Sequence, residues 1–159
     1  MPHRPLVWVT CLPLVAIVLP PVTLLAGQNA TPEETSAAEK CATAESFLTQ
    51  KLFLWQKRLK LEDWNISFKL VRLGELKPKT LGNIHWDSDL KKANMNILTP
   101  VDYKLTFLEA LKDMEFTIVH ELVHLQLSSL PRNEASRSAE EKAVNTLTDA
   151  LLHLDRRPQ

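Results

Sequence analysis

Apolar residues recur at every third or fourth position across residues 41–59, which is the spacing of one buried face of an α-helix. Ser36 and Glu39 stand at the spacing of a capping box ahead of this stretch, so we expect the helix to begin at Ser36. At Trp64 the period changes, and across residues 64–70 apolar and polar side chains alternate. This alternation predicts a half-buried strand directly after the helix.

Two further strands are expected next in the chain. Residues 81–86 follow a turn region that contains Gly74 and Pro78, and they predict the second strand. Residues 93–97 alternate between apolar and asparagine side chains and predict the third strand.

The rest of the chain is predicted to be helical. Thr99 and Pro100 end the third strand, and Pro100 favours the start of a helical segment. Residues 104–128 and 138–154 predict two helices, with a break at Pro131 between them. A helix, three strands and two helices in this order indicate an α+β domain with a small, mainly antiparallel sheet.

The N-terminus has the pattern of a targeting segment. Arg4 precedes an uncharged, mostly apolar stretch at residues 6–25, and small residues follow it. This pattern predicts a secretory signal peptide at residues 1–26, although the stretch is also long enough to be an uncleaved membrane anchor. Both alternatives predict an exported protein, periplasmic or secreted, with a polar tether at residues 27–35 and one domain at residues 36–159. A membrane is an expected partner only if the segment stays uncleaved.

Composition narrows the classes of function. The chain has 159 residues, enough for one domain with its own core, and its Lys+Arg and Asp+Glu counts are both 19. The absence of a basic excess argues against a nucleic-acid partner. Cys11 belongs to the leader, so Cys41 has no cysteine partner in the mature chain and is expected to be a small apolar residue on a helix face.

The segment His120-Glu121-Leu-Val-His124 carries the clearest chemistry in the sequence. It lies within a predicted helix, where residues four apart share one face, so both imidazoles can bind one Zn²⁺ ion. Glu121 is rotated by about 100° from His120, which sets it beside the metal and not on it. From there its carboxylate can act as the general base that takes a proton from water activated by the metal. The alternative is a buried helix whose two histidines are satisfied by ordinary hydrogen bonds.

A catalytic zinc site needs a third protein ligand. The metzincin pattern requires Gly at position 127 and His at position 130, and this chain has Leu127 and Leu130 instead. The remaining candidates are carboxylates at or near the last helix, which are Glu134, Glu140 and Glu141.

The two motifs together resemble those of gluzincin-type zinc metallopeptidases. The segment from Glu141 through Asn145 and onward along an apolar helix face is similar to the second motif of that group. The resemblance covers the last two helices and implies a zincin-like fold and zinc-dependent peptide hydrolysis. It further implies that Glu141 is the third zinc ligand and that Asn145 orients a ligand.

Two other interpretations of this segment stay open in the sequence. Ser138 and Glu141 also have the spacing of a capping box, in which Glu141 would bind its own helix start. Helical phase places Glu140 nearer the centre of the apolar stripe than Glu141, which favours Glu140 as the ligand. The motif spacing favours Glu141, and we follow the spacing.

The expected partner is a peptide or protein substrate, and a metal-binding zincin-fold module without hydrolytic activity is the alternative function. By the same resemblance, residues 92–98 could be an edge strand that pairs with substrate, or an ordinary edge strand. Tyr103 and His85 could reach an oxyanion, but neither lies in a motif, and we assign neither this role. Three tryptophans are expected in the core, namely Trp55, Trp64 and Trp86.

Overall fold

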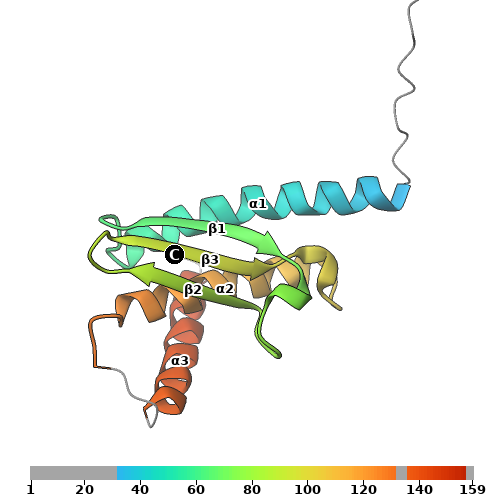
Figure 1. Ribbon diagram of the computed structural model, residues 1–159. Helices are drawn as coiled ribbons and strands as arrows, with labels where there is room; N and C mark the ends of the chain where they lie inside the picture. The colour runs from blue at the N-terminus through green and yellow to red at the C-terminus, as the bar shows by residue number, and fades with distance from the viewer. Residues whose placement is uncertain (1–31, 132–135, 157–159) are drawn as a thin grey trace, which may run out of the picture.

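The computed structural model describes residues 32–131 and 136–156 (Figure 1). This part of the chain is α+β, with a small three-stranded sheet and three α-helices, as the pattern predicts. Two short 3-10 helices complete it. The elements in chain order are α1 (Pro32–Arg58), β1 (Asn65–Val71), η1 (Leu73–Glu75), β2 (Gly82–Asp87), β3 (Lys92–Leu98), η2 (Pro100–Asp102), α2 (Phe107–Gln126) and α3 (Arg137–Asp155).

The strand order β1-β3-β2 makes β3 the central strand of the three-stranded sheet. β3 runs antiparallel to β2, with Ile84 opposite Met95, and parallel to β1, with Ile66 opposite Ala93. The prediction of a mainly antiparallel sheet is therefore wrong, because one of the two pairings is parallel. After β1 the chain forms β2 at the far edge of the sheet, and the β2–β3 hairpin then places β3 in the middle. The alternation of apolar and polar residues within a strand does not indicate this order of strands.

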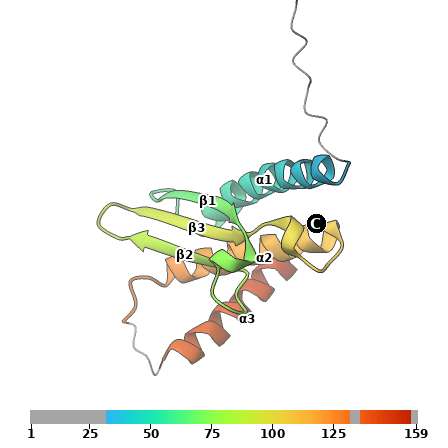
Figure 2. The ribbon, with the colours of Figure 1, turned by 45° about the vertical axis from the view of Figure 1, so that its right-hand side comes forward.

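The core lies between one face of the sheet and the helices α1 and α2, which Figures 1 and 2 show behind the strands. The alternation in β3 buries Ala93, Met95 and Ile97 against the helices. α1 contributes Trp55, and α2 contributes a continuous row of buried apolar side chains. Trp64 is also buried and Trp86 is partly buried against the core, so the expected core tryptophans are confirmed.

The first helix begins at Pro32, earlier than predicted. Ser36 and Glu39 therefore lie inside α1, and the expected capping box at Ser36 is wrong. The helix also extends into the segment expected as a tether, while the signal peptide or anchor expected at residues 1–26 lies outside the described residues. Within the described ranges, no helix is both long and apolar enough to cross a bilayer. Cys41 is a free, partly buried thiol whose sulfur lies 3.4 Å from the hydroxyl of Thr99.

The helix that carries the histidine motif has a defined start. Pro100 begins the short helix η2, and α2 begins only after Thr106, whose side chain accepts a hydrogen bond from the backbone N–H of Glu109. The Glu109 carboxylate in turn accepts one from the Thr106 backbone, which completes a capping box. α2 then runs along the core to Gln126, so the motif occupies its last two turns.

Candidate metal centre

His120 and His124 lie one turn apart on α2 and point into the same space, as the motif predicts. Their Nε2 atoms are 3.1 Å apart, and the rings meet edge to face. His124 is buried, with 8% of its surface exposed, and His120 is half-buried beside the ring of Phe116. The two nitrogens therefore present a pair of donors at the wall of a cleft.

α3 crosses the end of α2 and brings Glu141 to both histidines. The Glu141 carboxylate oxygens lie 3.3 Å from Nε2 of His124 and 3.5 Å from Nε2 of His120. These three residues form a group that could hold a metal ion, with ligand atoms within 4.8 Å of one another. Glu141 therefore lies where it could bind the same ion as the two histidines.

The capping-box interpretation of Glu141 is wrong because α3 begins two residues earlier than it requires. The helix begins at Arg137, and the backbone N–H of Glu140 donates to the carbonyl of Ser136 at 2.8 Å. Ser138 is already inside the helix, so it is not the cap. The third candidate, Glu134, lies outside the described residues.

The spacing of the three donors fits a small tetrahedral cation. Ligands about 2.0–2.1 Å from a central zinc ion lie about 3.3 Å from one another at the corners of a tetrahedron. The two Nε2 atoms, 3.1 Å apart, and the 3.3 Å between Nε2 of His124 and Oε1 of Glu141 are close to that edge length, while His120 is contacted by the other oxygen, Oε2, at 3.5 Å. Two imidazole nitrogens and one carboxylate oxygen also form a donor set that zinc accepts, and three ligands leave one corner open.

Glu140 contacts the other nitrogen of the same imidazole. Nδ1 of His124 lies 3.1 Å from a carboxylate oxygen of Glu140, whose side chain is 20% exposed. A carboxylate can only accept here, so Nδ1 carries the proton and Nε2 keeps its lone pair for the centre. Successive residues on a helix differ by about 100°, which lets Glu140 and Glu141 reach opposite sides of one ring. The sequence left Glu140 and Glu141 as alternatives for the third ligand, and in the structure each contacts a different nitrogen of the His124 ring.

The surroundings of His120 lower its pKa and so favour the neutral ring, which is the form that can bind a metal. Burial and the adjacent His124 lower the pKa of His120, against the opposing effects of Glu141 and Asn145. Its Nδ1 is buried without a hydrogen-bond partner among the described residues. Asn145 lines the same cleft and forms a hydrogen bond with the His120 side chain.

Glu121 lies beside the donor group and does not belong to it. Its side chain is buried, and burial, with a smaller effect of the Glu141 carboxylate, raises the pKa of Glu121 to about 7. It shares one cleft of about 820 Å³ with His120, His124 and Glu141. A carboxyl group with a pKa near neutrality can both accept and return a proton, which is what a general base requires.

Gly82 is a site residue that the sequence analysis missed. A Cβ atom at this position would lie 2.5 Å from Cγ2 of Thr117, 2.9 Å from the carbonyl oxygen of Asn96 and 3.6 Å from Oε1 of Glu121. Only a glycine lets the start of β2 approach α2 this closely. A glycine at the edge of a strand is a known signal of such an approach, although it does not say what is approached.

The strand at the cleft is β2 and not β3. The prediction of a substrate-binding edge at residues 92–98 is wrong, because those residues form the central strand and are paired on both sides. β2 is the outer strand on the α2 side, and Gly82, Ile84 and Trp86 line the cleft. Neither Tyr103 nor His85 is part of the cleft lining: His85 is exposed, and burial raises the pKa of the Tyr103 phenol.

Comparison with known proteins adds no relative. The chain matches no protein-family model, and neither the curated proteins nor the solved structures contain a match.

Proposed function

We propose that this protein is a zinc-dependent peptidase that holds Zn²⁺ through His120, His124 and Glu141 and uses Glu121 as its general base. The observation that carries the proposal is the convergence of these four side chains in one cleft, three at donor spacing and the fourth buried beside them. Burying a carboxylate costs desolvation free energy, so a buried carboxylate next to a potential metal site indicates a functional role.

Zinc would supply Lewis-acid chemistry there, by lowering the pKa of water and polarising the carbonyl of the scissile bond. The other contributions come from the chain itself. Glu121 accepts the proton that water loses and passes it to the nitrogen of the departing amine. Its pKa of about 7 suits both transfers near neutral pH. Glu140 holds the ring of His124 in the tautomer that presents Nε2.

The substrate backbone is proposed to lie along β2. Among the described residues β2 is an edge strand with β3 as its sheet neighbour, and an edge strand is where an extended peptide can add to a sheet. Gly82 brings the same strand against the helix that carries Glu121. This arrangement supports a gluzincin-like enzyme that acts on peptides or on exposed loops of proteins. The apolar N-terminal stretch in the sequence supports its export.

The direct test combines zinc content with hydrolysis of a mixed peptide library by the purified full-length chain. Wild type is expected to bind one zinc and to cleave peptides. His124→Ala should lose both properties, whereas Glu121→Gln should keep the metal and lose cleavage by at least about a hundredfold. Failure to bind zinc would overturn the whole proposal. One bound zinc without cleavage would overturn the enzymatic part and favour a metal-binding module.

A further inference from the structure

The carboxylates that line the cleft contact the histidines or lie buried beside them, whereas the cations that line it make no such contact. Glu141 faces both histidines and Glu140 binds His124, while Glu121 is buried between α2 and β2. The same cleft is lined by Lys77 and Lys79. It is also lined by Arg137, from the first turn of α3. We call Lys77, Lys79 and Arg137 the basic rim.

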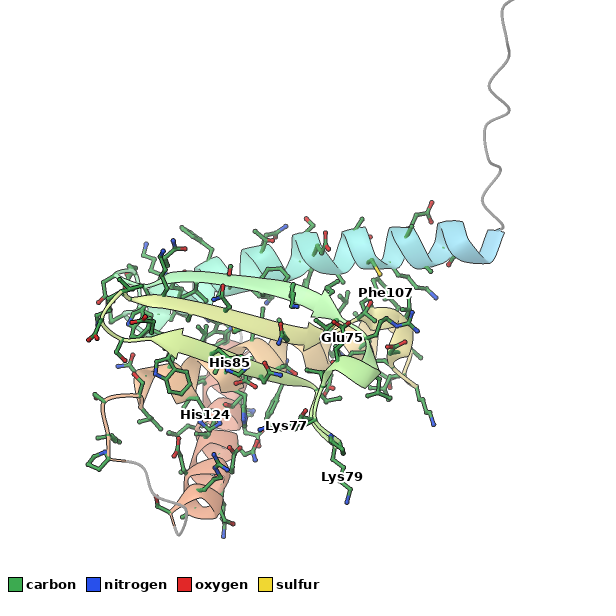
Figure 3. The ribbon with its side chains drawn as sticks, viewed as in Figure 1. Glu75, Lys77, Lys79, His85, Phe107 and His124 are labelled. Carbon is green, nitrogen blue, oxygen red and sulfur yellow. The ribbon has the colours of Figure 1, made fainter. Side chains whose placement is uncertain are left out.

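The basic rim comes from two elements that both line the cleft. Lys77 and Lys79 belong to the connection between η1 and β2, which Figure 3 shows below the end of the sheet, on the side where His124 and α3 lie. Arg137 is one helical turn before Glu141, so the same helix carries the cation and the candidate metal ligand. A substrate bound in the cleft would therefore meet cations from both elements.

None of the three cations forms an ion pair with another described residue. Other basic residues of the fold do pair, as Lys51 does with Glu115 at 2.8 Å and Arg72 does with Asp102. All three rim residues are exposed, so their charges can meet a ligand without first breaking an internal contact. Three positive charges without an ion-pair partner among the described residues therefore line the cleft that holds the candidate metal ligands.

We infer that this cleft selects acidic peptides, with Glu or Asp side chains close to the bond that is cut. The cleavage of these peptides rests on the proposed peptidase function, whereas the preference for binding them does not require hydrolysis. Carboxylates on either side of the reacting bond would pair with Lys77, Lys79 and Arg137. Because the rim is exposed, each pair contributes modestly and is screened by salt, so the preference should be severalfold and largest at low ionic strength.

The test measures binding by fluorescence anisotropy with Glu121→Gln, which leaves the peptide intact, in the presence of Zn²⁺. One probe is a labelled peptide in which glutamates alternate with alanines, and the other has glutamine at every glutamate position. We expect the acidic probe to bind about five- to tenfold more tightly at low salt. Adding Lys77→Gln and Lys79→Gln should remove most of this ratio.

The matched control is Lys69→Gln with Lys92→Gln, which removes two exposed cations outside the cleft. This pair should leave the ratio unchanged. Equal binding of the two probes, or equal losses in the rim and control variants, would overturn the inference. Preferential binding without hydrolysis by wild type would support the basic rim and reject the peptidase, so the two failures are distinguishable. Where wild type does cleave, kcat/KM for the acidic peptide should show the same ratio.

Discussion

The Glu140 carboxylate accepts a hydrogen bond from Nδ1 of His124 at 3.1 Å, on the side of the ring that faces away from His120. This contact fixes the tautomer and the orientation of a candidate metal ligand and leaves its Nε2 atom available. Helical phase favoured Glu140 and motif spacing favoured Glu141, and both carboxylates contact the imidazole of His124.

We expect Glu140→Ala to weaken zinc binding by about ten- to a hundredfold, because the His124 ring loses the partner that holds it in place. Glu140→Gln should be milder, since its amide oxygen still accepts the hydrogen bond. Affinity is measured by competition with a chromophoric chelator, with Glu39→Ala on α1 as the control. An unchanged affinity in Glu140→Ala would contradict the orienting role.

Gly82→Ala should destabilise the protein by about 1–3 kcal/mol, because the new methyl group collides with Thr117 and with the backbone at Asn96. The strand or the helix must shift to relieve this contact, so peptide cleavage is expected to fall as well. The free energy of unfolding comes from urea titration. Gly74→Ala is the matched control: nothing lies within 4 Å of its Cβ position, so it should be neutral or slightly stabilising.

Leu122→Ala should cost about 2–5 kcal/mol of unfolding free energy, because the side chain is completely buried inside the motif itself. Leu108 lies on the same helix and is 64% exposed, so Leu108→Ala should change stability by less than about 0.5 kcal/mol. Equal effects of the two substitutions in urea titration would show that the motif segment of α2 is not packed in the core.

The interaction of Asp102 with Arg72 makes the stability of the protein depend on pH. The side-chain hydrogen bond from Arg72 holds the pKa of Asp102 below its ordinary value of 3.8, with a further contribution from the backbone N–H of Leu73. A depressed folded-state pKa stabilises the protein above the unfolded pKa, and this stabilisation is lost as pH falls through the folded value. Asp102→Asn should therefore be less stable than wild type near pH 7.

The stability difference between wild type and Asp102→Asn should shrink as the pH is lowered below about 4. The measurement is a series of urea titrations across that range, with the exposed carboxylate of Glu62 replaced by Gln as the control. A difference that stays constant down to the lowest pH would show that the ion pair between Arg72 and Asp102 is not the cause.

Local information in the sequence was sufficient for the parts of the site that lie within one element. His120 and His124 are four residues apart on a helix, and helix geometry alone brings their rings together. The strands were also located to within about a residue, because alternation is a local signal. The order of strands in the sheet depends on contacts between distant segments, and for this reason β3 was misplaced at an edge.

The parts of the site that span two elements required the structure. Spacing and helical phase gave different answers for Glu140 and Glu141, and only the crossing of α3 over α2 shows what each carboxylate contacts. The same holds for Gly82, whose missing side chain matters because of Thr117 on another element. A glycine in a strand is visible in the sequence, but its neighbour is not.

The donor group of His120, His124 and Glu141 joins the last turns of α2 to the first turns of α3. A cation held there would act as a cross-link between two helices, so its binding free energy would add to the free energy that keeps α3 docked. Helix docking and metal affinity are then thermodynamically linked. Free zinc in the surroundings would set how firmly the C-terminal helix is attached, and a chelator would loosen that helix while the sheet and α1 remain packed.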